Sequence, residues 1–286
     1  MKRLFALLYL TFTCLMALGR QGDHVNTDTY VRSAVDRILA AVRNKEYAAV
    51  QDLFTSDGLD MYNRLIACGN AEISGDPDYS IFRDHGRLAV RSVPMAFSFE
   101  KGDRSAFFED VVLTFNGSGK IESLTFGLDE EVTLMNILSR RPWPRHCKVA
   151  LLEFLEDFRT TCSLQRLDHL RSLFDDDAIF FLQDDRNVKF IPRVGKDEYM
   201  RRIERCFSSS GFTYIRLSDI DILKRGNEGE VYGIQMKMDC CSENHVDTGY
   251  LFLLYDINHT DIPSIKAASW QSEPDPDEGL FNNSHL

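Results

Sequence analysis

The sequence lacks the short motifs that identify common enzyme classes. It contains no G-x-S-x-G, no H-E-x-x-H and no P-loop pattern, so the hydrolase, metalloprotease and nucleotide-binding templates do not apply. Positive charge is also scarce, because 33 Lys and Arg residues face 44 Asp and Glu residues and leave a formal net charge of -11. An acidic chain repels phosphate backbones, which argues against a nucleic acid partner. We therefore name no catalytic residue.

Cysteine is sparse and irregularly spaced. Of seven cysteines, none forms a C-x-x-C motif or clusters with histidine, which disfavours structural zinc and a redox function. Cys240 and Cys241 are adjacent, so in a strand they point to opposite faces. We expect no metal and no cofactor. We expect one disulfide at most, in the second half of the chain, and otherwise buried thiols.

Long apolar runs are absent except at the N-terminus. Lys2 and Arg3 precede an apolar stretch over residues 4–18, and a small-x-small cleavage site ends at Gly19. This pattern is typical of a secretory signal peptide over residues 1–19. The stretch is shorter than the roughly 20 residues that a transmembrane helix needs. We therefore expect an exported protein, in the periplasm or at the cell surface, without a transmembrane span.

Lipid attachment at Cys14 is the alternative to simple cleavage. A lipidation site needs small residues before its cysteine, and this chain has Phe12 and Thr13 there. Cleavage near Gly19 is therefore favoured over a lipid anchor.

The remaining chain repeats one order of elements: helices first, then strands. Apolar residues at helical spacing predict helices from Val31 to Phe54 and again from Val149 to Phe174. Alternating apolar residues predict strands after each helical pair. In the first copy these strands cover residues 88–93, 95–100, 107–115 and 121–126. In the second copy they cover residues 178–182, 188–192, 214–223, 230–240, 250–255 and 265–271.

Helices followed by hairpins indicate an α+β class. We expect two tandem cone-like domains, each an N-terminal helical layer packed on a curved antiparallel sheet. The expected boundaries are a first domain over 24–140, a linker over 141–147, a second domain over 148–275 and a flexible tail over 276–286.

Several connecting segments are expected to lack regular structure or to form short helices. Thr55 to Gly58 has turn chemistry and should end the second helix. Residues 71–79 should form a loop, and residues 129–138 a helix. Asp175 to Asp177 should form a helix-terminating turn rather than a calcium loop, because it lacks the order of a known calcium-binding loop.

The last two predicted strands resemble those of a known superfamily. Thr248-Gly-Tyr-Leu-Phe-Leu-Leu-Tyr255 and Ala268-Ser-Trp-Gln-Ser-Glu-Pro274 resemble the closing hairpin of exported bacterial members of the nuclear transport factor 2-like (ketosteroid isomerase-like, cystatin-like) superfamily. In those proteins a G-Y-L-F-L-L strand precedes a strand that ends in W-Q-P-E, and this chain has Ser272 in place of the proline. The first half, Val31 to Leu138, resembles a more degraded copy.

The resemblance implies a cone with a ligand pocket on the concave side of the sheet. It also implies pairing through the outer faces of the sheets, as an intramolecular pseudo-dimer or a homodimer. Its isomerases use an aspartate base with a tyrosine-containing oxyanion hole. Asp184, Asp239, Tyr199 and Tyr232 have suitable side chains, but none lies in a recognisable motif.

Four aromatic residues are candidates for a ligand pocket in the second domain: Tyr199, Tyr232, Tyr250 and Trp270. The alternative for Trp270, core packing of a large aromatic side chain, is favoured over ligand contact. On the strand over residues 230–240, Tyr232 belongs to the alternating set that we expect to face the core.

The absence of a catalytic constellation favours an exported, non-enzymatic binding or interaction protein of the cell envelope. Its partner would be a small apolar ligand or an envelope protein. The alternative is a ketosteroid isomerase- or dehydratase-like enzyme with its site in the second-domain cone. A third possibility is a carrier for a small apolar ligand. Fold resemblance alone does not decide among them.

Overall fold

The computed structural model describes residues 28–84, 87–99, 106–128, 142–183, 193–209, 212–226, 229–242, 245–258, 263–275 and 279–285. The expected signal peptide with Cys14, the helix expected over 129–138 and the strand expected over 188–192 lie outside these residues. We call residues 28–128 the first lobe and residues 142–285 the second lobe.

The first lobe consists of helices followed by sheet A. Its helical part contains a helix over residues 28–44, the 3-10 helix η1 (Tyr47–Leu53), α2 (Ser56–Tyr62) and the π-helical turn η2 (Asn63–Ala67). Sheet A contains β1 (Glu72–Ile73), β2 (Ser80–Asp84), β3 (Arg87–Phe97), β4 (Phe107–Phe115) and β5 (Ile121–Phe126). The strand order is β1-β3-β4-β5, with β2 also paired to β3.

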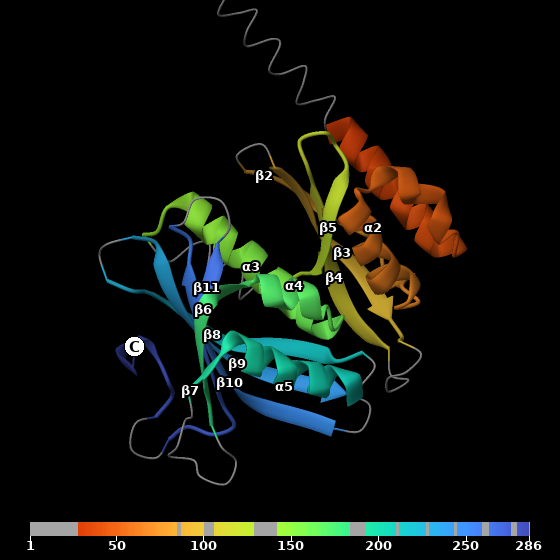
Figure 1. Cartoon of the computed structure of the whole chain (residues 1–286). Coiled ribbons are helices and arrows are strands. Elements are labelled where there is room, and N and C mark those ends of the chain that lie inside the picture. Colours follow the sequence, from red (N-terminus) through yellow and green to blue (C-terminus); the bar gives the residue numbers. More distant parts are fainter. Residues whose placement is uncertain are drawn as a thin grey trace, which may run out of the picture.

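The core of the first lobe lies between the helices and one face of sheet A. Val35, Ile38 and Val42 recur at helical spacing and are fully or almost fully buried, as the periodicity predicts. They pack in one cluster with alternate residues of the sheet, among them Val111 and Phe115. Figure 1 shows these helices on one side of sheet A, which leaves its other face toward the second lobe.

The described residues of the second lobe form three α-helices and sheet B. Its helices are α3 (Arg145–Ser163), α4 (Leu167–Ser172) and α5 (Lys196–Ser209). Sheet B contains β6 (Phe174–Leu182), β7 (Arg193–Gly195), β8 (Tyr214–Lys224), β9 (Val231–Ser242), β10 (His245–Asp256) and β11 (Ser264–Gln271). The short 3-10 helix η4 (Asn283–His285) follows near the C-terminus.

Sheet B has the strand order β7-β6-β11-β10-β9-β8. Its pairings are antiparallel except that of β6 with β11, which is parallel. Register shifts interrupt the pairing of β8 with β9 and of β10 with β11, with the extra residue on β8 and on β11, and Asp219 in the β8 shift has a positive φ of 50°. Such bulges bend a strand and increase its twist, so the sheet curves around its helices. The molecule is therefore of the α+β class, with helices placed before curved, largely antiparallel sheets.

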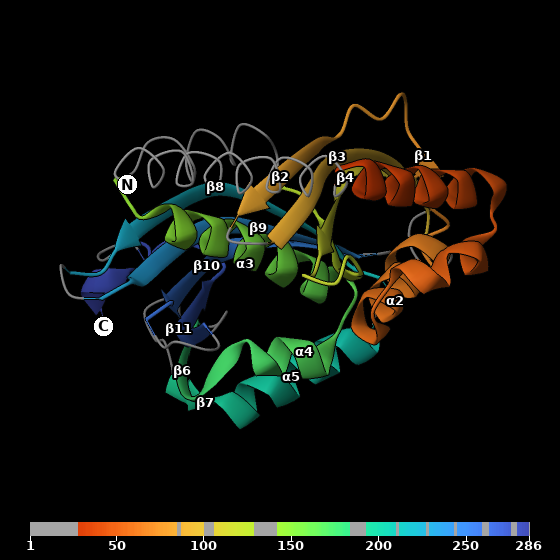
Figure 2. The ribbon, with the colours of Figure 1, turned by 90° about the horizontal axis from the view of Figure 1, so that it is seen from above.

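Helix α3 lies between the two sheets. It contacts β8, the edge strand of sheet B, and β5, the edge strand of sheet A. Figure 2, the view from above, shows α3 running alongside both sheets. Its apolar residues Leu151, Leu155 and Phe158 belong to the core of the second lobe. The same helix therefore helps form one core and joins the two lobes.

The structure corrects two expectations in the first lobe. The second helix ends before Thr55 as expected, but Thr55 to Gly58 form no turn. The Thr55 hydroxyl instead accepts a hydrogen bond from the Gly58 N–H at 3.1 Å and caps a further helix, α2. Threonine favours turns and N-caps for the same reason, its short side chain bonding to nearby backbone. Within the loop expected over residues 71–79, Glu72 and Ile73 form β1.

Three further corrections concern the second lobe. Asp175 to Asp177 lie within β6 rather than in a turn, and Lys266 on the adjacent β11 pairs with Asp175 at 2.5 Å. Residues 279–285, expected in a flexible tail, instead lie against sheet B with Phe281 buried. The proposed linker ends earlier than expected, because Arg145 to Cys147 form the first turn of α3.

The burial of the cysteines was predicted only in part. The six cysteines of the described residues form no disulfide. Cys147 and Cys162 are buried, but Cys68 and Cys206 are exposed, so the expectation of buried thiols is wrong for these two. Among the helices of the described chain, none has the length and apolar character to cross a membrane.

Candidate functional site

Arg159 is the central side chain of the contact between the lobes. It lies on α3, and its Nε donates to the carbonyl of Ile215 on β8 at 2.8 Å. Its Nη1 donates to Gly127 O at 2.9 Å and to Glu109 Oε2 on β4 at 3.0 Å, while Nη2 donates to Glu109 Oε1. The Arg159 and Glu109 side chains are only 6% and 7% exposed. This bidentate pair therefore ties α3 and both sheets together.

Two other side chains of α3 bond to the free edge of sheet A. Thr160 Oγ1 accepts from Phe126 N at 2.8 Å and donates to Glu156 O at 2.7 Å. Glu156 Oε1 accepts from Leu128 N at 3.0 Å. An edge strand otherwise leaves such backbone groups unpaired. The side chains of α3 thus accept hydrogen bonds from the backbone N–H groups of Phe126 in β5 and of Leu128 after it, as a neighbouring strand would.

A second ion pair lies beside the first. Arg91 on β3 donates to both carboxylate oxygens of Glu156, with Nη1 at 3.0 Å from Oε2. Glu156 is 2% exposed, and this burial raises the pKa of its carboxyl, although Arg91 and the Leu128 N–H act in the opposite direction. Buried carboxylates need such partners, because desolvation penalises their charged form. The interface therefore depends on two buried ion pairs.

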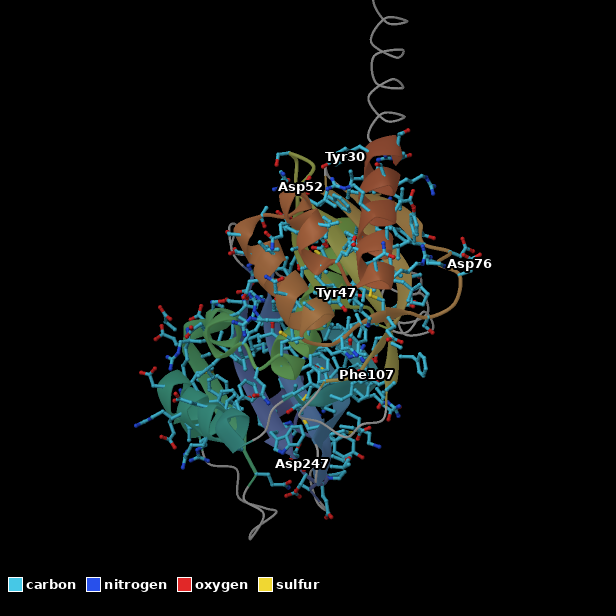
Figure 3. The ribbon with its side chains drawn as sticks, turned by 90° about the vertical axis from the view of Figure 1, so that its right-hand side faces the viewer. Tyr30, Tyr47, Asp52, Asp76, Phe107 and Asp247 are labelled. Carbon is cyan, nitrogen blue, oxygen red and sulfur yellow. The ribbon has the colours of Figure 1, made fainter. Side chains whose placement is uncertain are left out.

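Aromatic side chains close one end of the interface. Phe99 and Phe107 of the first lobe stack on Phe212 of the second, with ring centroids 3.8 Å and 5.4 Å apart. Phe107 also lies 4.7 Å from the ring of Tyr214. Figure 3 shows Phe107 where the two lobes meet. Tyr214, which adjoins this stack, donates its hydroxyl hydrogen to Glu109, so the aromatic side chains lie next to the Arg159–Glu109 pair.

A cleft of about 600 Å³ opens beside this interface. Both lobes contribute to its walls, which come from β3, β4 and the end of β5 on one side and from α3 and β8 on the other. The lining residues are Ser74, Pro94, Met95, Phe108, Glu109, Asp110, Gly127, Leu128, Arg159, Tyr214, Arg216, Leu217 and Ser218. Its volume is in the range of small-molecule sites.

The cleft combines a cation, two carboxylates (Glu109 and Asp110), hydroxyls and an exposed ring. Arg216 lines it and is exposed, and Phe108 is 67% exposed at its wall. Tyr214 donates its hydroxyl hydrogen to Glu109. Burial, with this bond to Glu109, raises the pKa of Tyr214 to about 12, so the hydroxyl stays protonated. Arg216 offers an anionic group a partner and Phe108 offers an aromatic ring a surface, whereas Asp110 in the same wall opposes negative charge near it; Glu109 is already paired with Arg159.

Three of the four sequence-predicted pocket residues face the core of the second lobe. Tyr232 is fully buried, and Tyr199 and Trp270 pack against the same core. The ring of Tyr199 stacks on Phe180 with centroids 4.0 Å apart, and burial raises the pKa of Tyr199. The Trp270 ring lies over Gly249, where a Cβ would overlap it. These positions match the core-packing alternative, and a ligand role for them stays a prediction.

Tyr250 lies on the opposite face of sheet B. Its neighbours Leu251 and Leu253 belong to the core under α3, whereas Phe252 and Leu254 belong to a separate cluster on the outer face. Alternation along β10 places Tyr250 with the second set. The structure therefore does not bring Tyr250 together with the other three candidates.

A polar cluster lies at one end of the second core. Tyr232 donates its hydroxyl hydrogen to Glu230 Oε2, and Lys224 Nζ donates to Glu230 Oε1 at 2.7 Å. The Cys147 thiol donates to the same carboxylate at 3.4 Å. Burial alone would raise the pKa of Glu230, but these hydrogen bonds outweigh it and lower the pKa. The carboxylate therefore stays ionised.

The residues that sequence reasoning missed are charged side chains inside apolar elements. Glu156 and Arg159 lie among buried apolar residues of α3, and the sequence pattern assigned no role to either of them. The only local signal is their position between buried residues of α3. Of the two aspartates considered for catalysis, Asp239 accepts from Thr248 at 2.8 Å, and Asp184 lies outside the described residues. The described residues hold no group of three or more His, Cys, Asp or Glu side chains placed for a metal ion.

Comparison with known proteins finds similarity only at the level of structure. No protein-family model matches the chain, and no curated protein matches it. A nuclear transport factor 2-like protein of unknown function from Pseudomonas putida is 13% identical and has a TM-score of 0.38. The match covers 48% of this chain and 96% of that one.

Two other solved structures are similar to a comparable degree. The β subunit of benzoate 1,2-dioxygenase from Burkholderia mallei is 14% identical, covers 43% of this chain and 88% of its own, and has a TM-score of 0.34. Bd1075 of Bdellovibrio bacteriovorus is 10% identical, covers 69% and 96%, and has a TM-score of 0.36. Identities and scores this low carry no argument about function, so the function must be inferred from the site.

Proposed function

We propose that the protein is an exported, non-enzymatic binding protein built from two tandem nuclear transport factor 2-like domains, and that its ligand binds between them. The cleft lined by both lobes carries this proposal. Its walls are held by the Arg159–Glu109 pair and the aromatic stack, so the cleft is preformed, which reduces the entropy lost on binding. The proposal of export rests on the signal-like residues 1–19.

The lining changes the kind of ligand we expect. A purely apolar ligand would leave Arg216, Tyr214 and the serine hydroxyls facing apolar surface, which is unfavourable. A small aromatic anion would place its ring against Phe108 and its charge beside Arg216. We therefore propose an amphipathic aromatic ligand with one anionic group.

Binding of 8-anilinonaphthalene-1-sulfonate, an aromatic sulfonate, tests this proposal. We expect the native protein to bind it saturably at one site, followed by fluorescence. Arg216→Gln and Phe108→Ala should each weaken binding severalfold. Phe82→Ala is the matched control, because Phe82 is 48% exposed on β2 and does not line the cleft. Absence of saturable binding, or binding that both cleft variants leave unchanged, would refute the proposal.

A second candidate function is favoured by the Glu230–Tyr232 pair. Glu230 would be the base, and Tyr232 would have to move its hydroxyl hydrogen bond from Glu230 to the substrate carbonyl to stabilise the developing oxyanion. The candidate activity is isomerisation of a β,γ-unsaturated ketone to its conjugated form. The ultraviolet absorbance of the conjugated product reports it. We expect Glu230→Gln to abolish any acceleration, and a wild-type protein that gives none rejects this candidate.

A further inference from the structure

The walls of the cleft between the lobes carry charges of both signs. The lining contains two carboxylates, Glu109 and Asp110, and two guanidinium groups, Arg159 and Arg216. Glu109 and Arg159 bind each other and are buried, whereas Asp110 and Arg216 are exposed. Asp110 belongs to β4 of the first lobe, and Arg216 belongs to β8 of the second. The cleft therefore presents a negative charge from one lobe and a positive charge from the other.

The first-lobe wall combines a ring, a carboxylate and a hydroxyl. Phe108 and Asp110 are two positions apart on β4 and both exposed, and such residues share one face of a strand at a spacing of roughly 7 Å. Pro94 stands opposite Asp110 in the sheet register, and its carbonyl accepts a hydrogen bond from Ser74 N at 3.0 Å. Ser74 also lines the cleft. A ring on Phe108 thus brings a positive group attached to it close to Asp110.

The second-lobe wall is formed by alternate residues of β8. Tyr214, Arg216 and Ser218 line the cleft and alternate with the buried residues Ile215 and Leu217, so the three share one face of the strand. The guanidinium group therefore lies on the strand between two hydroxyl-bearing side chains. A guanidinium group binds a carboxylate through parallel hydrogen bonds, and hydroxyls on either side can donate further ones.

A ligand with charge of only one sign does not suit both walls. A simple anion would meet Asp110 in a chain whose formal net charge is already -11, and a simple cation would cover Arg216 without pairing it. Covering a charged group without giving it a partner is unfavourable. A ligand that carries both charges offers a partner to each wall. A carboxylate accepts several hydrogen bonds, so Asp110 can bind an ammonium group in addition to other partners.

We propose that the cleft binds an aromatic amino acid in its zwitterionic form. Its ring packs on Phe108, its ammonium group binds Asp110 beside Ser74, and its carboxylate binds Arg216. The proposal rests on the proposed function, because it adds a positive group to the aromatic anion that the cleft is proposed to take. The first lobe then selects the ammonium group, and the second lobe selects the carboxylate.

Three indole compounds that differ only in charge test the proposal. L-tryptophan carries both charges, indole-3-propionate lacks the ammonium group, and tryptamine lacks the carboxylate. We expect L-tryptophan to bind the wild-type protein at one site, measured by isothermal titration calorimetry. Each single-charge compound should bind about three- to fivefold more weakly, the contribution of one exposed ion pair.

Two variants should show opposite preferences. Arg216→Gln should weaken L-tryptophan and indole-3-propionate and leave tryptamine unchanged. Asp110→Asn should weaken L-tryptophan and tryptamine and leave indole-3-propionate unchanged or more tightly bound. Damage to the fold would weaken all three compounds together, so the crossed pattern reports the contacts themselves. Asp247→Asn is the matched control, because Asp247 is exposed on β10 and does not line the cleft.

The outcomes separate this inference from the proposed function. Indole-3-propionate that binds as tightly as L-tryptophan, in a manner that needs Arg216, rejects the zwitterion and leaves the aromatic anion. Failure of all three indole compounds and of 8-anilinonaphthalene-1-sulfonate rejects both proposals. Equal weakening of the three compounds by Asp110→Asn rejects the ammonium contact. If a variant does not fold, as judged by circular dichroism, the ranking of the three compounds on the wild type decides.

Discussion

At the residue scale, the buried charges of α3 dominate the energetics of the contact between the lobes. Every nitrogen of the Arg159 guanidinium donates a hydrogen bond, to Glu109, Gly127 or Ile215. A buried ion pair is stabilising only when its hydrogen bonds are satisfied, and removing one partner leaves the other charge buried and unpaired.

We therefore expect Arg159→Ala to lower the free energy of unfolding by about 3–5 kcal/mol, because Glu109 loses its partner in a buried site. Urea denaturation measures the change. The matched control is Arg37→Ala, which removes a bidentate pair with Asp52 on the surface, where both side chains are well exposed. The control should lose far less stability, since exposed pairs are weak. Equal losses in the two variants would contradict the role given to burial.

Asp175 gives a prediction about acid stability. The hydrogen bond from Lys266 lowers the pKa of Asp175 below its ordinary value of 3.8, and the Asp177 N–H adds to the effect. A lowered folded-state pKa stabilises the protein above the unfolded pKa, and this contribution is lost as the pH falls through the folded pKa. Asp175→Asn should therefore lose stability at pH 7 and show a shallower decline below about pH 5.

Unfolding curves at a series of pH values test this. Asp177→Asn is the matched control, because it keeps the backbone N–H that bonds to Asp175 and removes a neighbouring exposed carboxylate. It should leave the contribution of the Lys266 pair in place. If Asp175→Asn follows the wild-type acid profile, the pair does not contribute.

At the element scale, strands with regular alternation are well predicted by the sequence. The bounds expected for β4 and β5 are those of the structure. In β9, Tyr232, Ile234 and Met236 face the core as the alternation predicts. Helix α2 was missed because its N-cap, Thr55, uses the same side-chain chemistry as a turn, and because Gly58 disfavours a helix interior.

Gly58 allows α2 to pack closely against β5. A Cβ at this position would overlap the carbonyl oxygen of Ile121 on β5. We expect Gly58→Ala to destabilise the protein by about 1–3 kcal/mol, although alanine is the better helix former. Gly117→Ala is the matched control, since nothing lies near its Cβ position, and its effect should stay within about 0.5 kcal/mol. Thermal denaturation compares the two, and a stabilising Gly58→Ala would show that the helix can move away from β5.

Helix α3 shows why the site could not be predicted from local pattern. Its apolar face was predicted, because Leu152, Leu155 and Phe158 recur at helical spacing. The partners of Arg159 lie far away in the chain, with Glu109 and Ile215 50 and 56 positions away. From local pattern alone, a charged residue on a helix is predicted to face solvent, because its distant partners are not known. The cleft, whose walls come from both lobes, has the same long-range origin.

At the scale of the whole molecule, α3 makes the two lobes interdependent. It contributes Leu151, Leu155 and Phe158 to the second core and Arg159 to the edge of sheet A. The first lobe therefore buries its open edge only when α3 is folded. Contacts between structural units set how cooperatively they unfold. A shared helix with buried ion pairs couples the lobes more strongly than the polar surfaces that usually join domains.

We therefore expect a single unfolding transition in scanning calorimetry, with equal calorimetric and van't Hoff enthalpies. The double variant Arg91→Ala, Arg159→Ala removes both buried ion pairs between the lobes and should separate this into two transitions. The matched control is Arg37→Ala, Arg64→Ala, which removes two exposed pairs within the first lobe and should keep a single transition. Two transitions in the wild type would mean that α3 does not couple the lobes. The cleft between them would then not be preformed, and the rigidity on which the proposed ligand site depends would be lost.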